Sequence, residues 1–560
     1  MLMDNSNRKI IPYRNGKAGL IAGLCQAVGV DRIFNELLTP EVGRPPEIAY
    51  GDLAQMFLMS MADDHHPLSR LLEYLETLDL EALIKCKVDI DQLNDDRFGG
   101  FLDLMHQAGG SEILSRVAVS AFNHYGILLK SVNYDTTSKI MWGEYQTQDG
   151  VVGTIDITFG HSKQHRPDKR QMILSMGTTQ GICVDGGIHS GNQSDKTYNV
   201  ENLDRAVEVK ARFKTDDESP FFYIADSASF TVAFLEKAKL AKMDVITRMP
   251  DNINECKRVI EKALDVLETL PTYVFPSSTS PTVYQVMSDQ CIYEGIPLSL
   301  GVCYSQKLES TKFKLIHKKV LKERDTLEAQ IKLLKKRPFA CIEDANLEIE
   351  KLNKTVLKKA MYHSVDFQIS EQNIKRPGRP SKDPALNCTR TEYTIHSVIE
   401  VDQAAIDRAI QRECIFVVAS TVVTMSGIEI LREYKSQSAV ERKFQFLKSP
   451  QFVNALYVDS PRRAESLGYL MLILILLLSV GEHVVRREME KESASIVGPG
   501  KKILTRPSLI AIFRIFYSVQ TIATYEKGVI TREFTEELRP NVKEVMRYLG
   551  LPEEIFIRNS

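Results

Sequence analysis

The sequence lacks the cysteine pairs that mark zinc ribbons and disulfide frameworks. Its nine cysteines are scattered through 560 residues, and no two of them stand in a Cys-x-x-Cys arrangement. A structural zinc ribbon and a secreted disulfide scaffold are therefore both disfavoured, and scattered thiols are typical of a protein in a reducing compartment. We expect the chain to be cytoplasmic.

The chain also lacks an excess of charge of either sign. It has 71 Lys and Arg against 73 Asp and Glu, so the whole molecule has no net attraction for nucleic acid, and any basic surface must be local. Residues 1–20 lack the apolar run and cleavage site of a signal peptide. No G-x-x-x-x-G-K-[ST] phosphate loop occurs, so we expect no nucleotide cofactor.

Long hydrophobic runs are scarce, and one of them could be taken for a membrane span. The run "LGYLMLILILLLSVG", residues 467–481, carries no charge, but a helix needs roughly 20 residues to cross a bilayer. Charged residues bound it on both sides, among them Arg463 and Glu482. We interpret it as a helix buried inside protein, with a membrane span as the alternative.

The composition that remains is that of an ordinary globular protein, with 43% hydrophobic and 26% charged residues. A chain of 560 residues exceeds a single hydrophobic core, so several domains are expected. The periodicity of apolar residues predicts five parts. They are a helical N-terminal module (1–128), the first part of an α/β core (129–250), an insertion with a helical hairpin and strands (251–425), a helix completing the core (426–460) and a helical C-terminal region (461–560).

Residues 129–250 predict three strands, a helix, a strand, a helix and a strand. That order suits a mixed sheet with helices on its faces, in which the first and fourth strands can be neighbours. Asp135 ends the apolar run "SVNYD", and Asp226 ends "FYIAD". A carboxylate buried there is costly unless a cation compensates it. We therefore expect Asp135 and Asp226 to meet at one edge of the sheet.

A third acid can come from the helix that covers this edge. In "REYKSQSAVERKFQFLK", residues 432–448, helical spacing places four polar side chains on one stripe beside an apolar one: Tyr434, Gln437, Glu441 and Lys448. Carboxylates without His or Cys suit Mg²⁺ or Mn²⁺. Two such ions about 4 Å apart support phosphodiester displacement. The alternative for this helix is an amphipathic surface helix with no catalytic role.

These segments together resemble a known family, the prokaryotic insertion-sequence transposases of the DDE class. The similar motifs are "NYDTTS", "GHSKQHRPDKRQ", "GNQSDKT", "IADSA" and "VITRMP". Residues 434–448 are similar to the signature Y-x2-R-x3-E-x6-K, with Gln437 in the place of Arg. The resemblance implies an α/β RNase H-like core, split by a large insertion before the Glu.

The resemblance also implies the activity and its residues. Asp135, Asp226 and Glu441 would be catalytic and would hold two Mg²⁺ or Mn²⁺ ions, while Tyr434 and Lys448 would contact double-stranded DNA of the transposon ends. Because Gln437 stands in the place of Arg, the resemblance gives less support to a charged phosphate contact at this position. The expected partners are end DNA, target DNA and a second copy of the chain in a synaptic homodimer, in a prokaryotic cytoplasm at the nucleoid. The N-terminal helices are the candidates for end recognition, and the C-terminal helices for subunit pairing.

Further basic residues are candidate DNA contacts. Arg248 follows a predicted strand, and an ion pair with a structural carboxylate is the alternative. Arg376 and Arg379 lie in "KRPGRPSK", which resembles an AT-hook core that enters a narrow minor groove, or is a linker stiffened by prolines. Residues 305–360 carry 15 Lys and Arg against 8 Asp and Glu, which fits a solvated helical hairpin or an arm that contacts phosphates.

Some acids and histidines are rivals to these candidates. Asp168 and Asp185 lie near the chosen carboxylates in the sequence and could replace them. His161 and His165 are four residues apart, but no third His or Cys stands nearby, so a zinc site is disfavoured. Two other functions remain open: an RNase H-like nuclease without strand transfer, and a catalytically silent DNA-binding repressor.

Overall fold

The computed structural model describes most of the chain and divides it into two compact units. The residues outside the description are 1, 5–7, 39–45, 64–65, 86, 89, 143–144, 146–153, 163–165, 194, 214–220, 276–280, 376–387, 436–457, 459 and 559–560. The first unit comprises Met1–Thr247, Ser420–Val422 and Arg432–Ser560, and the second comprises Arg248–Ala419 and Val423–Leu431.

The first unit contains the mixed sheet that the sequence predicts. Its strands are β3 (Ser131–Ile140), β4 (Gln171–Thr179), β5 (Ile182–His189), β6 (Phe222–Ala225) and β7 (Asp244–Arg248), in the order β5-β4-β3-β6-β7. The pairs β3–β4 and β4–β5 are antiparallel, whereas β3–β6 and β6–β7 are parallel. This is the RNase H-like strand order, and the predicted α/β fold class is confirmed.

A tight turn explains why β4 and β5 form a hairpin. Gln180 and Gly181, the two residues between the strands, both have positive φ, at 50° and 81°. Two consecutive positive φ angles characterise the turn whose twist matches that of an antiparallel pair. The β-rich runs "QMILSMGTT" and "GICVDGGIHSG" lie close enough in the sequence to predict a hairpin, and the prediction is confirmed.

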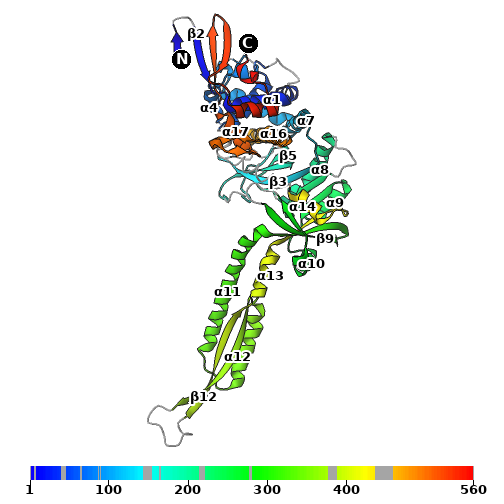
Figure 1. The fold of residues 1–560 in the computed structure, drawn as a ribbon, viewed down its shortest axis with the longest axis vertical. Helices are drawn as coiled ribbons and strands as arrows, with labels where there is room; N and C mark the ends of the chain where they lie inside the picture. The colour runs from blue at the N-terminus through cyan, green and yellow to red at the C-terminus, as the bar shows by residue number, and fades with distance from the viewer. Residues whose placement is uncertain are drawn as a thin grey trace. The chain divides into compact units, whose positions relative to one another are not determined.

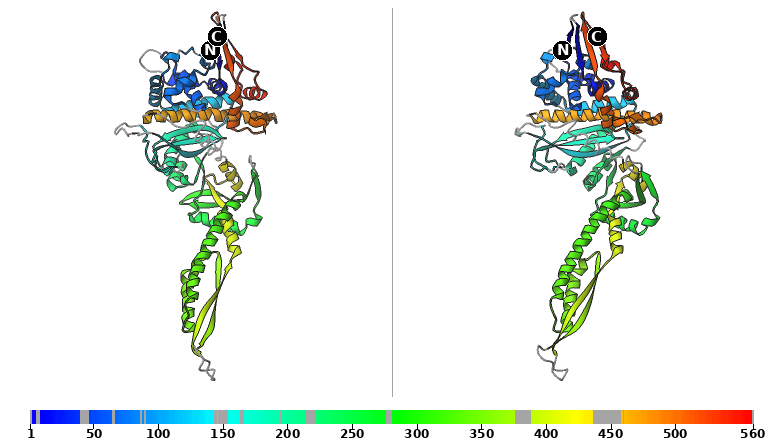
Figure 2. Two further views of the ribbon diagram at one scale, coloured as in Figure 1. Left: turned by 90° about the vertical axis from the view of Figure 1, so that its left-hand side faces the viewer. Right: turned by 60° about the vertical axis from the view of Figure 1, so that its left-hand side comes forward.

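Helices cover both faces of this sheet. Helix α8 (Asp195–Arg212) connects β5 to β6, and α9 (Val232–Leu240) connects β6 to β7. On the opposite face, α16 (Pro461–Lys491) packs against β5, as Figures 1 and 2 show. Helix α16 contains the apolar run, and 94% of its most apolar window is buried inside the protein. The interpretation of this run as a helix buried inside the protein is therefore confirmed. By length and composition alone, the 31 residues of α16 could also cross a membrane.

The N-terminal helices pack on the other side of α16 (Figure 2). They are α1 (Gly16–Val28), α2 (Val30–Leu37), α3 (Tyr50–Ala62), α4 (Leu68–Leu75), α5 (Leu80–Ile84), α6 (Asp95–Ala108) and α7 (Gly110–Tyr125). The guanidinium of Arg463 at the start of α16 pairs with Asp103 of α6 at 2.7 Å. Helix α16 therefore lies between the helical module and the sheet.

The two ends of the chain also contribute strands, which the sequence does not predict. Strands β1 (Leu2–Asp4) and β2 (Arg8–Tyr13) join β16 (Thr521–Glu526) and β17 (Val529–Phe534) in an antiparallel sheet of order β1-β2-β16-β17. The rest of the C-terminal region is mainly helical, with α17 (Leu509–Ile515), α18 (Pro540–Leu549) and α19 (Glu554–Ile557). The predicted boundaries at 128 and 461 remain predictions.

The second unit contains four further strands next to one another. Strands β8 (Thr272–Phe275), β9 (Thr282–Tyr293), β10 (Ile296–Ser305) and β13 (Ile415–Ser420) take the order β13-β10-β9-β8. Helix α10 (Asn254–Asp265) packs on β9 and β10.

From this sheet extends an arm, residues 306–413, in which helices pack along a β-hairpin (Figure 1). It contains α11 (Glu309–Lys335), α12 (Ile342–Thr355), β11 (His363–Lys375), β12 (Cys388–Val401) and α13 (Gln403–Glu413). Leu327, Ile331 and Leu352 form one of its small hydrophobic clusters. The two predicted charged helices are confirmed, and the hairpin strands β11 and β12 pack beside them.

The insertion leaves and re-enters the core at one place. In the first unit, the amide of Thr421 donates to the carbonyl oxygen of Val245 at 3.1 Å, and the amide of Val245 donates to the hydroxyl of Thr421 at 2.9 Å. The chain therefore returns to β7 after the whole insertion. Helix α14 (Gly427–Lys435) follows this return.

Candidate active site

The two predicted catalytic aspartates lie at equivalent positions on neighbouring parallel strands. Strand β3 pairs with β6 in the register Ser131↔Phe222, Val132↔Tyr223 and Asn133↔Ile224. Asp135 and Asp226 each stand two residues beyond the last of these pairs. Adjacent strands are about 4.8 Å apart, so the two carboxylates emerge side by side. The prediction that the first and fourth strands are neighbours is confirmed.

The strand that carries Asp135 is longer than the sequence predicts. The apolar pattern ends at Asp135, but β3 continues to Ile140 because β4 pairs with it from Asp135↔Met176 to Ile140↔Gln171. By contrast, β6 ends at Ala225, just before Asp226. Asp135 therefore lies in the middle of β3, half-buried, while Asp226 is exposed at the end of β6.

Hydroxyl groups fix the backbone of Asp226. Its carbonyl oxygen accepts hydrogen bonds from the hydroxyls of Ser229 and Thr247, both at 2.7 Å, and these two hydroxyls lie 2.8 Å apart. The Asp226 carboxylate accepts from the amide of Ala228 at 3.0 Å, as the cap of a short 3₁₀ helix. The carboxylate is thus oriented before any ligand binds. Sequence reasoning missed Ser229 and Thr247, because a bond to a backbone carbonyl leaves no pattern in the sequence.

The opposite face of the sheet holds the two strands together. The rings of Tyr134 and Tyr223 stack with centroids 4.9 Å apart, and each tyrosine is buried. Asp226 keeps an extended backbone, with φ −76° and ψ −176°. Because side chains alternate along a strand, both aspartates point away from this tyrosine pair.

The rival acid Asp185 belongs to that tyrosine face. Its buried carboxylate pairs with the guanidinium of Arg205 at 2.7 Å and accepts a hydrogen bond from the Tyr134 hydroxyl at 3.1 Å. Burial, with Asp185 nearby, raises the pKa of Tyr134 well above its usual value, so this hydroxyl stays protonated. Asp185 is therefore a structural acid on the far side of the sheet from Asp135.

The other rival, Asp168, forms an exposed ion pair. Arg166 donates two hydrogen bonds to it, at 2.8 and 2.7 Å, and lowers the pKa of Asp168 to about 2. Asp168 thus has a local partner in its own turn.

The predicted catalytic helix is described only at its start. Tyr434 is half-buried in α14, while Gln437, Glu441 and Lys448 lie outside the described residues. Burial raises the pKa of the neighbouring Glu433, and the charge of Lys130, which immediately precedes β3, lowers it in part. This electrostatic coupling places the end of α14 near the start of the strand that carries Asp135.

The remaining predicted DNA contacts are only partly described. Arg248 lies over the ring of Phe416, at 5.7 Å from its centroid, and its guanidinium is 3.5 Å from the carboxylate of Asp251. The pair is exposed, so a salt bridge of this kind contributes little to stability. Arg376 and Arg379 fall outside the described residues. Their contact with DNA remains a prediction.

The described donors suit a hard cation but do not complete a site. Asp135 and Asp226 supply carboxylate oxygens on adjacent strands, which are the ligands that Mg²⁺ and Mn²⁺ prefer. Within the described part of the chain, no group of three or more His, Cys, Asp or Glu side chains is placed to hold a metal ion. The third predicted ligand, Glu441, lies outside that part.

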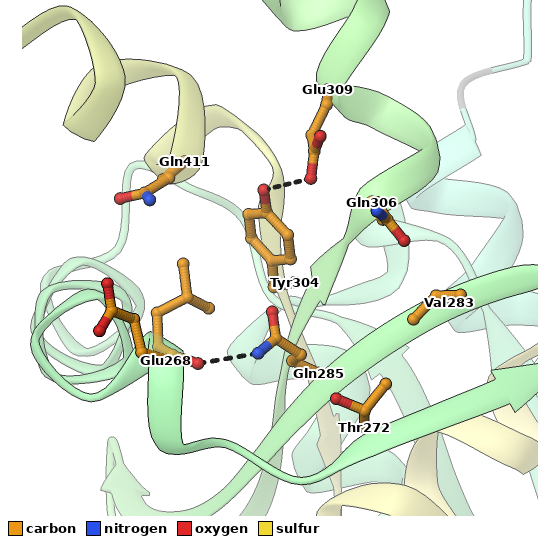
Figure 3. A pocket seen from close by; sticks show the side chains of 9 residues that line it. Glu268, Thr272, Val283, Gln285, Tyr304, Gln306, Glu309 and Gln411 are labelled. Carbon is orange, nitrogen blue, oxygen red and sulfur yellow. Dashed lines mark hydrogen bonds between the residues drawn. The ribbon is translucent and has the colours of Figure 1, made fainter.

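The second unit contains a hollow that is lined mainly by polar residues. Its volume is about 380 Å³, and its lining includes Glu268, Gln285, Tyr304 and Glu309 (Figure 3). The Tyr304 hydroxyl donates to the Glu309 carboxylate at 2.7 Å, and the Gln285 amide donates to the carbonyl of Leu267 at 2.9 Å. Two of its polar side chains thus donate to other groups of the lining, and none of the predicted site residues lines it.

The chain is similar to one protein family and, at low identity, to solved structures. Residues 14–119 match a family described as a domain of unknown function, DUF4277. No curated protein matches the sequence. Among solved structures, a piggyBac transposase synaptic complex with hairpin DNA is similar at 10% identity and a TM-score of 0.35, over 91% of this chain and 82% of that chain. A Mos1 transposase paired-end complex with the left transposon end is similar at 13% identity and a TM-score of 0.15, over 37% of this chain and 61% of that chain. Scores this low do not define a shared fold, so the fold assignment rests on the strand order.

Proposed function

We propose that the chain is a DNA transposase of the DDE class. It cuts DNA at the ends of an insertion sequence and joins the freed 3′-hydroxyl to target DNA. The observation that carries this proposal is the matched position of Asp135 and Asp226 on β3 and β6. An RNase H-like sheet with two acids at this edge supports phosphodiester chemistry, and the sequence resemblance extends it to transposition.

Three acids would form the catalytic centre: Asp135, Asp226 and Glu441. They would hold two Mg²⁺ or Mn²⁺ ions, which activate an attacking hydroxyl and stabilise the leaving oxygen in such sites. The protein's own contribution is to hold these carboxylates in place. The Ser229 and Thr247 hydroxyls fix the main chain of Asp226, and the Tyr134–Tyr223 stack fixes the two strands.

The proposed DNA contacts surround this centre. Tyr434 and Lys448 would meet the end DNA on the helix that carries Glu441, with Gln437 between them. Arg248, Arg376 and Arg379 are the further basic candidates. A homodimer would bring two ends together, and the site of action would be the prokaryotic nucleoid in the cytoplasm.

Neutralising one catalytic acid tests the proposal. Asp135→Asn and Asp226→Asn should each lower cleavage of labelled end DNA by at least about 100-fold, because metal stabilisation supplies several kcal/mol of the barrier. The matched control is Asp204→Asn, which changes an exposed acid of α8 paired with Lys237 and should leave cleavage unchanged. Full cleavage by Asp135→Asn would contradict the proposal.

The same assay separates the two alternatives. Paired end DNA and a supercoiled target, incubated with Mg²⁺, should yield strand-transfer joints. Cleavage without joints would identify a nuclease with the same sheet and acids. Binding of end DNA without cleavage, and without Mn²⁺ uptake in calorimetry, would identify a silent repressor.

A further inference from the structure

The hairpin of β3 and β4 continues beyond the end of β6 into an outer ribbon, residues 140–142, 156–159 and 169–171. In this ribbon Ile140 pairs with Gln171, and the amide of Met141 donates to the carbonyl of Arg170 at 3.0 Å. On the other side, Thr158 and Gln171 exchange backbone hydrogen bonds at 3.2 and 2.9 Å. Three chain segments therefore lie side by side at its outer end.

Two exposed aromatic rings lie on this ribbon, each with a cation over it. Trp142, the single tryptophan of the chain, is 49% exposed, and the ammonium of Lys169 lies 4.6 Å from its ring centroid. Phe159 is 52% exposed, and the guanidinium of Arg170 lies 5.3 Å from its centroid. Arg170 also donates to the carbonyl of Ile157 at 3.1 Å, which fixes its position.

Each ring lies across the ribbon from the cation that contacts it. Trp142 lies across from Lys169, and Phe159 across from Arg170, in the registers that Ile140↔Gln171 and Thr158↔Gln171 set. The ribbon end thus presents two exposed aromatic rings, each with its own cation.

Large exposed aromatic rings need a reason, because burying such a ring would contribute strongly to stability. An aromatic face for stacking and a cation for phosphate is the combination that binds unpaired nucleotides. The bases of an intact duplex already stack on one another, so an external ring gains most from bases that are unpaired. An apolar protein partner would not call for a cation over each ring.

We propose that the outer ribbon stacks unpaired DNA bases, with Trp142 as the principal platform and Lys169 as its phosphate contact. The inference rests on the proposed function, since it supplies the DNA. Trp142 lies seven residues beyond Asp135 in the sequence, at most about 23 Å along a strand. At 3.4 Å per nucleotide step, that is at most about seven nucleotides. The ribbon would therefore hold bases that open within about seven nucleotides of the cut phosphate.

The single tryptophan makes a direct test possible. Trp142 emission of the full chain is measured in the presence of a metal chelator, against a single-stranded thymidine oligonucleotide and a blunt duplex of equal length. Stacking should quench the emission with the single strand and leave it largely unchanged with the duplex. Emission unchanged by both would overturn the inference.

Variants separate stacking from general DNA affinity. With a labelled oligonucleotide, Trp142→Ala should bind the single strand about tenfold more weakly, the order expected for one stacked base. Trp142→Phe, which keeps a ring, should retain most of the affinity and also shows whether the site tolerates a change without unfolding. The matched control is Tyr517→Ala, since Tyr517 is another exposed ring with a cation, Lys17, at 5.7 Å. An equal loss in Tyr517→Ala, or none in Trp142→Ala, would overturn the inference.

The outcome also distinguishes this inference from the proposed function. If the wild-type chain cuts and joins DNA while Trp142 emission stays constant, only the stacking site fails. If emission is quenched but no cleavage occurs with Mg²⁺, the ribbon is a DNA-binding site and the transposase proposal fails.

Discussion

At the residue scale, the acids of the RNase H-like sheet divide into structural and catalytic candidates. Asp185 is buried and carries its own cation, Arg205, together with the Tyr134 hydroxyl. Asp226 is exposed, and its main chain is held by neutral hydroxyls. A buried acid with a dedicated cation serves the fold, whereas Asp226 is the acid to which we assign the proposed catalytic role. The two kinds of acid should respond differently to the same substitution.

Asp185→Asn should destabilise the first unit, because it leaves Arg205 without a charge partner. Breaking a buried ion pair costs about 3–5 kcal/mol. Asp226→Asn keeps an oxygen for the cap on Ala228 and should cost less than about 1 kcal/mol. Urea unfolding monitored by Trp142, which lies in this unit, measures both. Equal midpoints for the two variants would contradict this division of roles.

At the element scale, α16 combines an apolar centre with a partly buried acid close to a histidine. Glu465 lies near the start of the helix, and its carboxylate is 3.3 Å from the imidazole of His106 on α6. Burial raises the pKa of Glu465 from 4.5 to about 7, and burial lowers the pKa of His106. Near neutral pH the protonated acid and the neutral imidazole avoid placing two charges inside the protein.

The raised pKa gives the first unit a pH-dependent stability. Because the folded chain keeps a proton that the unfolded chain releases, Glu465 contributes stability that is full below about pH 4.5 and is lost as the pH rises to about 7. The loss should be about 3 kcal/mol. The lowered pKa of His106 makes its contribution to stability rise with pH, opposite to that of Glu465. The contribution of Glu465 is therefore isolated by comparing the wild type with Glu465→Gln.

The difference in unfolding free energy between wild type and Glu465→Gln should therefore fall from pH 4.5 to 7 and then level off. Glu490→Gln, on an exposed position of the same helix, is the control and should leave the pH profile unchanged. A difference curve that is flat across this range would show that Glu465 titrates as an exposed acid does.

Some strands of this fold are predictable from the sequence and others are not. The buried strands are visible as apolar runs, and their order correctly makes β3 and β6 neighbours. The extension of β3 through "TTSKI" is not visible, because those residues are held by pairing with β4 rather than by their own apolar pattern. Strand β2 is missed for a similar reason: its partner β16 lies some five hundred residues away in the sequence. The placement of Asp135 and Asp226 on neighbouring strands was predictable from their apolar runs, whereas the hydroxyls that hold Asp226 depend on tertiary contacts.

At the scale of the whole molecule, the two ends of the chain form one packed region of the first unit. Strand β2 pairs with β16, and the buried guanidinium of Arg532 on β17 contacts Asp79 at 2.7 Å and Glu81 at 2.9 Å. Helix α1 packs on α19, where Gly19 faces the ring of Phe556. The N-terminal helices are therefore stabilised by residues from the far end of the sequence.

Gly19→Ala tests this packing. A Cβ atom at Gly19 would lie 2.0 Å from Cε1 of Phe556, so the ring must move, and overpacking of this kind costs about 1–3 kcal/mol. Gly481→Ala on α16 is the matched control, because its nearest neighbour, Leu24, would be at an ordinary 3.6 Å. That variant should be neutral or more stable by up to about 1 kcal/mol. Thermal unfolding measures both, and Phe556→Leu should relieve part of the cost of Gly19→Ala.

The hydrogen bonds between Val245 and Thr421 have a further consequence for the history of the molecule. Because the chain returns to β7 after the insertion, the residues after β7 and before Ser420 form a cassette whose two ends are attached at neighbouring points. Lengthening, trimming or exchanging that cassette need not disturb the pairing of β3 with β6. A short bridge in place of the arm should therefore leave the sheet that carries Asp135 and Asp226 able to fold.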